Sequence, residues 1–257
     1  MERALRAGVR VAAPTVATFV AHEPLVAGAQ LTLGEDAAHH MRVRRLDVGD
    51  AVALRDGAGH SGEGRLVRLA KSHAVVELGA VREHAPPPPV HLVVPVADRE
   101  RMLWLAEKAV EIGVASWRPV LFRRSRSVGA RGEGPAFQAK VRARMLAALS
   151  QSEAAWLPDL HPDAPLERVI AASPAGARWV CDPDGEPLIA GAVASEEAAT
   201  VVVGPEGGLE PDELAALRDA GFRPAALPGN ILRFETAAVV AAALARALVE
   251  RAGPAIP

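Results

Sequence analysis

The chain is poor in several residue types, and each shortage excludes a class of protein. Its 257 residues include a single cysteine, Cys181, and no tyrosine. One cysteine excludes an intramolecular disulfide framework and fits the reducing cytoplasm, where we expect the protein to act. The formal net charge is only −2, so the surface as a whole carries no excess of either sign that would indicate a partner.

Long apolar runs are also missing. The longest candidate, residues 237–249, is interrupted by Arg246 and is shorter than the roughly 20 apolar residues that a membrane span needs. No second cysteine or spaced histidine set completes a zinc site, and the adjacent His39 and His40 point apart on a helix, so we expect no metal. The G-x-S-x-G elbow of many hydrolases is absent too. The 50% of residues that are hydrophobic are enough for a substantial core.

A run of four prolines, residues 86–89, is the clearest boundary in the chain. It cannot continue a helix or a central strand. We therefore predict a disordered extension over residues 1–16, a small β domain over 17–86 and an α/β domain over 87–257. The small domain has short, alternating apolar runs that predict an antiparallel sheet or barrel, with one helix over residues 36–46.

After the prolines, apolar strands alternate with amphipathic helices. Strands are predicted around residues 90–96, 117–122, 178–182, 199–203 and 222–227. Helices are predicted around residues 99–113, 137–151, 211–221 and 235–250, and Gly113 is a natural helix end. This alternation predicts a mostly parallel sheet with helices on both faces.

Two glycine-containing turns follow strands of this sheet and predict a ligand site. One is Gly204–Gly208 and the other is Pro228–Asn230. Ligands of open parallel sheets bind where such turns converge, and glycines let the backbone approach them closely. The first turn lacks the lysine and hydroxyl of a triphosphate loop and carries Glu206, which would repel phosphate. The turns therefore suit a neutral or cationic ligand, such as a nucleoside that bears a sulfonium.

Arg233 immediately precedes the last predicted helix. A cation is unfavourable at the positive amino-terminal end of a helix, so Arg233 is a candidate contact for a phosphate or a base. Glu235 and Thr236 are predicted to cap the same helix. Basic residues gather in two further places, residues 39–45 and residues 118–144. Local basic clusters on a slightly acidic chain indicate a polyanion bound at a defined place.

Five segments in this order resemble one family. They are "HHMRVRRLDVGD", "EKAVEIGV", "QSEAAWLPDL", "VVVGPEGGLEPDEL" and "LPGNILRFETAAVVAAALARAL". Together they resemble the bacterial small-subunit (16S) ribosomal RNA uridine-N3 methyltransferases of the SPOUT superfamily. The resemblance implies a PUA-like RNA-binding barrel, a trefoil-knotted α/β methyltransferase domain, a homodimer and S-adenosylmethionine as the cofactor.

The resemblance also implies roles for particular residues. Arg233 and Glu206 are the catalytic candidates. The cofactor contacts are Gly204, Pro205, Glu206, Gly207, Gly208, Leu227, Gly229, Ile231 and Leu232. The RNA contacts are His40, Arg42, Arg44, Arg45, Arg123, Arg124 and Arg126.

The chain departs from the family pattern at several positions. Asn230 stands where members usually have Arg, Phe234 where they have Thr, and Glu210 where they have Ser or Thr. These departures keep two alternatives open: a ribose 2′-O RNA methyltransferase of the same superfamily, and a non-catalytic ribosome-assembly factor.

Overall fold

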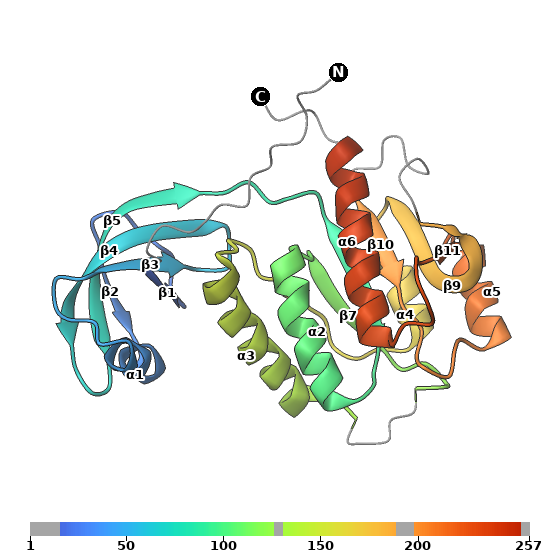
Figure 1. The fold of residues 1–257 in the computed structure, drawn as a ribbon, viewed down its shortest axis with the longest axis horizontal. Coiled ribbons are helices and arrows are strands. Elements are labelled where there is room, and N and C mark those ends of the chain that lie inside the picture. Colours follow the sequence, from blue (N-terminus) through green and yellow to red (C-terminus); the bar gives the residue numbers. More distant parts are fainter. Residues whose placement is uncertain (1–15, 126–130, 189–197, 253–257) are drawn as a thin grey trace.

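The computed structural model describes residues 16–125, 131–188 and 198–252. The chain forms two sheets that are joined by an extended segment through the prolines (Figure 1). Within the described residues, no helix has the length and apolar character needed to cross a membrane. The predicted extension, residues 1–16, lies almost wholly outside the described residues, and the predicted domain boundaries stay predictions.

The first sheet has five strands in the order β1-β3-β4-β5-β2. Its elements are β1 (Ala17–Val20), β2 (Gln30–Leu33), α1 (Glu35–Val43), β3 (Ala51–Arg55), β4 (His60–Leu69) and β5 (Ala74–Glu83). The predicted antiparallel pairing is correct for β2, β3, β4 and β5 but wrong for β1, which runs parallel to β3. A parallel pair needs a long connection, and here β2 and α1 supply it. Ala38 and Met41 of α1 are fully buried in the core of this sheet.

The second sheet has six strands in the order β11-β9-β10-β6-β7-β8, and every pairing in it is parallel. The strands are β6 (Val90–Pro95), β7 (Ser116–Val120), β8 (Asp159–Leu160), β9 (Ala177–Pro187), β10 (Ala199–Val202) and β11 (Arg223–Ala226). The helices are α2 (Arg99–Ile112), α3 (Pro135–Ser152), α4 (Leu166–Ala171), α5 (Pro211–Asp219) and α6 (Phe234–Ala252).

Alternate residues of the central strands face opposite layers of helices. In β6, Leu92 and Val94 belong to the core formed with α2, α3 and α6, whereas Val93 belongs to the core formed with α4 and α5. All three side chains are fully buried. The predicted sheet with helices on both faces is therefore confirmed, and strands covered on both sides explain the continuous apolar runs in the sequence.

Details at the helix ends differ from the prediction. Gly113 does end α2, with a left-handed φ of 76°. The last helix, however, begins at Phe234, so Thr236 lies in its first turn and does not cap it, whereas Glu235 lies in the first turn, where its charge favours the positive end of the helix. The amide of Ala237 donates to the carbonyl of Arg233, so the first turn of the helix includes Phe234, whose side chain is buried in the main core. The short elements β8 and α4 carry too little periodicity to be predicted.

Arg246, the charge that interrupts the apolar run of α6, is buried and has a structural role. Its guanidinium donates to the carbonyl of Pro88, in the proline segment, and to the carbonyl of Gly113, at the end of α2. Both acceptors are carbonyls left without helix or strand partners, as is usual at such ends. Arg246 therefore ties α6 to the first strand–helix unit of the large sheet.

Candidate cofactor and RNA sites

The first glycine turn follows β10 at the carboxyl edge of the large sheet. The amide of Gly208 donates to the carbonyl of Pro205 at 2.8 Å, which closes a tight turn, and Gly208 has a φ of 76°. Among the hydrogen bonds of the described residues, none uses the amides of Glu206 and Gly207. Both residues are exposed. These amides are therefore available to a ligand, since a backbone donor needs a partner or water.

The second turn follows β11 and combines an open backbone with apolar side chains. Gly229 has a φ of 104°, and a Cβ built there would meet no atom within 4 Å. Leu227 and Leu232 pack partly against the main core, whereas Ile231 is 99% exposed. Across the described part of the chain, the amides of Gly229 and Ile231 have no hydrogen-bond partner. This turn offers free backbone donors beside apolar surface.

Arg101, near the start of α2, connects the first glycine turn to the start of α6. Its guanidinium forms an ion pair with Glu206 of the first turn, and its Nε lies 3.8 Å from Glu235 in the first turn of α6. The Oε2 atom of Glu235 is buried and has no hydrogen-bond partner. Arg101 could not be predicted as a site residue from the sequence, because 105 residues separate it from Glu206 and only the parallel sheet brings the two together. The charge of Glu206 is therefore directed at α2.

As the sequence predicts, Arg233 immediately precedes the last helix, α6. Its side chain is exposed, and its carbonyl accepts the amide of Ala237 at 2.8 Å. Within the described residues, its guanidinium makes no ion pair or hydrogen bond. Arg233 follows the second turn closely in the chain, so its guanidinium is available to a ligand bound at this turn.

The basic residues on α1 form an exposed cluster on the small sheet. Arg42 donates to the carbonyls of Ala70 and Lys71, at 2.6 and 2.9 Å. His40, Arg44 and Arg45 are exposed and, among the residues that the structure covers, have no acidic partner. These charges remain available to a polyanion.

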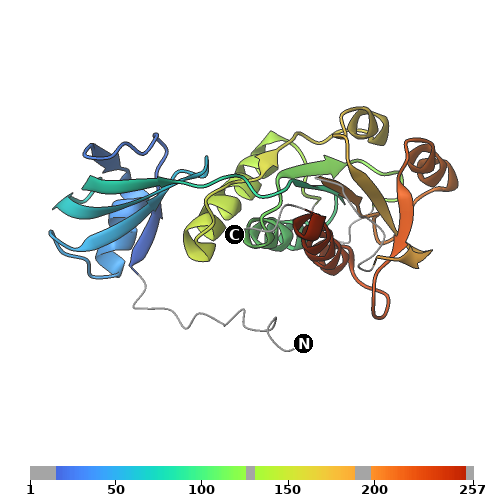
Figure 2. The same ribbon diagram turned by 90° about the horizontal axis from the view of Figure 1, so that it is seen from above.

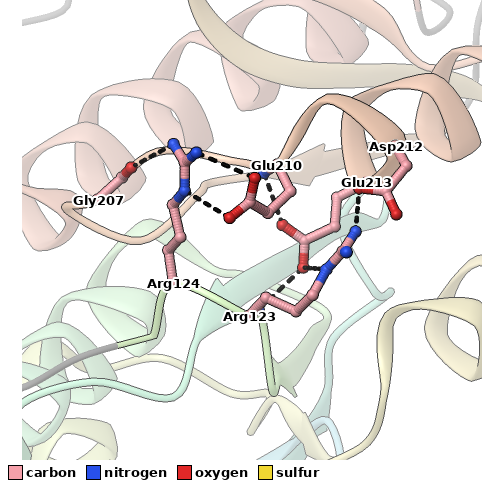
Figure 3. Close-up of polar contacts among 6 residues, drawn as sticks. All are labelled: Arg123, Arg124, Gly207, Glu210, Asp212 and Glu213. Carbon is pink, nitrogen blue, oxygen red and sulfur yellow. Dashed lines mark hydrogen bonds and ion pairs between the residues drawn. The ribbon is translucent and has the colours of Figure 1, made fainter.

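The second predicted RNA-binding run has different surroundings. Arg123 and Arg124 follow β7 and face the acidic start of α5 (Figure 3). Arg123 pairs with Asp212, and its Nε lies 3.9 Å from Glu213. Arg124 pairs with Glu210 at 2.8 Å. The third member of the run, Arg126, lies outside the described residues.

Cys181 is in the large sheet and is not reactive. Burial raises the pKa of its thiol to about 12, so the nucleophilic thiolate is scarce at neutral pH. The side chain of Cys181 packs against the main core of the large sheet.

Family models match both parts of the chain. Residues 84–246 match the model of an RNA methyltransferase domain, and residues 33–79 match that of an RNA methyltransferase PUA domain. A fold with a PUA-like sheet before a parallel α/β sheet agrees with the sequence prediction.

Curated relatives share the same description. The chain is 32% identical to "Ribosomal RNA small subunit methyltransferase E" of Mycobacterium bovis, with 85% of this chain and 86% of that protein covered. It is 28% identical to the protein of the same name from Synechocystis, with 86% and 74% covered.

A solved structure has the same fold. The ribosomal RNA small subunit methyltransferase E of Neisseria gonorrhoeae, crystallised with S-adenosylmethionine, superposes with a TM-score of 0.81. Its sequence is 26% identical, and the match covers 91% of this chain and 98% of that one.

Proposed function

Because the chain belongs to the ribosomal RNA small subunit methyltransferase E family, we propose that it methylates small-subunit ribosomal RNA with S-adenosylmethionine, at N3 of a uridine. The relatives' names support the reaction class and the RNA, and the sequence resemblance alone supports the uridine N3 atom. The observation that carries the proposal is the pair of glycine turns with free amides, the first of which Arg101 connects to the start of α6.

The turns fit the proposed cofactor in charge and shape. A nucleoside with a sulfonium is cationic, and Glu206 supplies a carboxylate while no lysine lies in either turn. The proposed contacts are Gly204, Pro205, Glu206, Gly207, Gly208, Leu227, Gly229, Ile231 and Leu232. Apolar Leu227, Ile231 and Leu232 suit the face of an adenine, and the open space at Gly229 admits a close approach.

When bound, the cofactor supplies an electrophilic methyl group. The residues of the chain hold the reacting base and its charge. A uridine attacks through N3 only after that atom loses its proton, and the charge then spreads to the neighbouring oxygens. The exposed Arg233 guanidinium is placed to stabilise this charge, and alignment of the two reactants contributes much of the remaining rate enhancement.

The RNA is proposed to lie across both parts of the molecule. His40, Arg42, Arg44 and Arg45 present exposed donors on the small sheet. Arg123 and Arg124 can contact RNA only by giving up their ion pairs with α5. A homodimer, as the resemblance implies, and a trefoil knot in the large domain are parts of the same proposal.

The test is methyl transfer to purified small subunits from a strain that lacks the gene, followed by digestion to nucleosides and mass spectrometry. We expect 3-methyluridine. A 2′-O-methylated ribose would instead identify the sugar methyltransferase. Absence of both transfer and cofactor binding, measured by calorimetry, would identify a non-catalytic assembly factor.

Glu206→Gln tests, in the same assay, whether methyl transfer needs the charge of Glu206. This change keeps the size of the side chain and removes the charge that faces Arg101. We expect methyl transfer to fall at least about tenfold, because the first turn loses the ion pair that fixes it to α2 and the reactants lose alignment. Undiminished turnover would remove Glu206 from the reaction.

A further inference from the structure

Besides Arg101, a second arginine holds the first glycine turn from outside, and this residue is Arg124. Its Nε and Nη2 donate to the two carboxylate oxygens of Glu210, at 2.8 and 2.9 Å, and its Nη1 donates to the carbonyl of Gly207 at 3.1 Å (Figure 3). A two-pronged arginine–carboxylate contact fixes direction as well as distance. One guanidinium therefore connects the turn to the residue that begins α5.

The backbone of Arg124 also packs against the turn. A Cβ on Gly207 would lie 3.1 Å from the Cβ of Arg124 and 3.4 Å from its carbonyl oxygen. The first distance is tighter than ordinary packing, so a larger residue at 207 would press Arg124 away by a few tenths of an ångström. The same residue therefore contacts Gly207 through its side-chain hydrogen bond and through close packing.

A second brace fixes the segment that carries Arg124. The buried carboxylate of Glu213 accepts the amide of Arg123 at 2.9 Å and the amide of Glu210 at 2.8 Å. It therefore connects the chain after β7 directly to the first turn of α5. Arg124 therefore follows a residue whose backbone is anchored to α5.

The charged groups on this surface pair with one another, and the carboxylates outnumber the guanidiniums. Three carboxylates, those of Glu210, Asp212 and Glu213, face two guanidiniums. The Arg123 guanidinium lowers the pKa of the Asp212 carboxyl, which keeps it ionised. A polyanion would meet an acidic helix start here, so the arrangement favours an internal role for Arg124 over an RNA contact.

We propose that Arg124 is a positioning residue of the cofactor turn: it holds the Gly207 carbonyl and the Glu210 carboxylate so that the free amides of Glu206 and Gly207 stay aimed at the cofactor. This rests on the proposed function. It also gives a role to Glu210, one of the positions where the chain departs from the family pattern. A carboxylate there accepts both prongs of Arg124, which a hydroxyl cannot do.

The test compares Arg124→Ala, Arg124→Lys and Glu210→Gln with the wild type in S-adenosylmethionine calorimetry, RNA binding and steady-state kinetics. We expect Arg124→Ala to raise the Kd and KM for S-adenosylmethionine about tenfold, with kcat at saturating cofactor largely kept. Arg124→Lys keeps the charge without the two-pronged geometry and should rescue only part of the loss.

The matched control is Arg218→Ala. Arg218 is an exposed arginine near the other end of α5, with Asp182 at 3.9 Å, and it touches neither turn. Its removal should leave the Kd unchanged. Glu210→Gln should weaken cofactor binding in the same direction as Arg124→Ala, and its smaller change of shape gives a reading even if Arg124→Ala does not fold.

Two results would overturn the proposal, and they are distinguishable from failure of the proposed function. An unchanged cofactor Kd in folded Arg124→Ala and Glu210→Gln proteins would show that the turn does not need this brace. An unchanged Kd together with weaker RNA binding would assign Arg124 to the RNA. A wild-type chain that does not bind S-adenosylmethionine would instead refute the proposed function itself.

Discussion

His91, at the start of β6, is kept neutral by its surroundings. Burial is the main cause that lowers the pKa of its imidazole to about 4, and the nearby Arg118 and His161 lower it further. Asp159 acts in the opposite direction but is outweighed. Nδ1 of His91 lies 2.8 Å from the hydroxyl of Ser116. His91 is at the amino-terminal edge of the sheet, opposite the glycine turns, so its titration concerns stability rather than catalysis.

A stability–pH profile checks this assignment. The folded-state pKa lies below the unfolded value of 6.5, so the contribution of neutral His91 is fully present above pH 6.5 and is lost as the pH falls towards 4. We expect the free energy of unfolding to fall over this window. His91→Asn keeps a polar atom near the Nδ1 position and cannot titrate, so its profile should be flatter. Parallel profiles, measured by urea denaturation, would contradict the assignment.

At the scale of helices and strands, the sequence predicted the elements that have a clear hydrophobic periodicity or end in a glycine. The large strands, the four long helices of the α/β part and the end of α2 at Gly113 are all present. Both glycine turns also follow strands, as predicted. The short strand β8 and the parallel partner β1 were missed, because neither length nor alternation distinguishes them from loops.

The candidate site was predicted less completely than the fold. Sequence patterns place residues on elements, whereas the pairing of distant charges depends on how the elements meet. The partners of Arg101 and Arg124, which are Glu206 and Glu210, lie more than 80 residues away in the chain, so no local sequence pattern indicates these pairs. From the sequence alone, a basic run such as the one that contains Arg124 is interpreted as an RNA-binding surface, because the carboxylate that pairs with it is distant in the chain.

Arg246 provides a prediction at this scale, since it connects α6 to two other elements. Arg246→Met keeps the length of the buried side chain and leaves the carbonyls of Pro88 and Gly113 without this donor. We expect a loss of about 3 kcal/mol in the free energy of unfolding, because buried acceptors without partners are costly.

Urea denaturation of Arg246→Met measures this loss. Arg168→Met, at an exposed arginine of α4, is the control and should change stability by less than about 0.5 kcal/mol. Equal stability of Arg246→Met and the wild type would show that the buried guanidinium contributes no net stabilisation.

For the whole molecule, the loop after α3 fixes the small sheet to the large one. Trp156 donates its Nε1–H to the carbonyl of His84 at 3.2 Å, and its ring covers Gly59, where a Cβ would lie 2.3 Å from the Trp156 Cζ2. Two backbone hydrogen bonds of 2.9 Å join the same two loops. The amide of Gly59 donates to the carbonyl of Ala155, and the amide of Leu157 donates to the carbonyl of Gly57. Figure 2 shows the small sheet beside α3, at the end of the extended segment.

This junction decides whether the RNA-binding sheet and the cofactor turns act as one surface. If RNA spans both, a fixed orientation lets the second contact form at a high effective concentration once the first has formed. Loosening the junction should therefore weaken RNA binding without changing the affinity for a cofactor held wholly by the large sheet.

Trp156→Ala tests this coupling, because it removes the ring and the Nε1–H donor while leaving both sheets intact. We expect RNA affinity to fall about tenfold, the Kd for S-adenosylmethionine to stay the same, and small-angle scattering to show a larger radius of gyration. Trp104→Ala, at a tryptophan of α2 that is 45% exposed, is the matched control and should leave the scattering unchanged. A Trp156→Ala protein as compact as the wild type, with equal RNA affinity, would show that the proline segment alone sets the orientation of the two sheets.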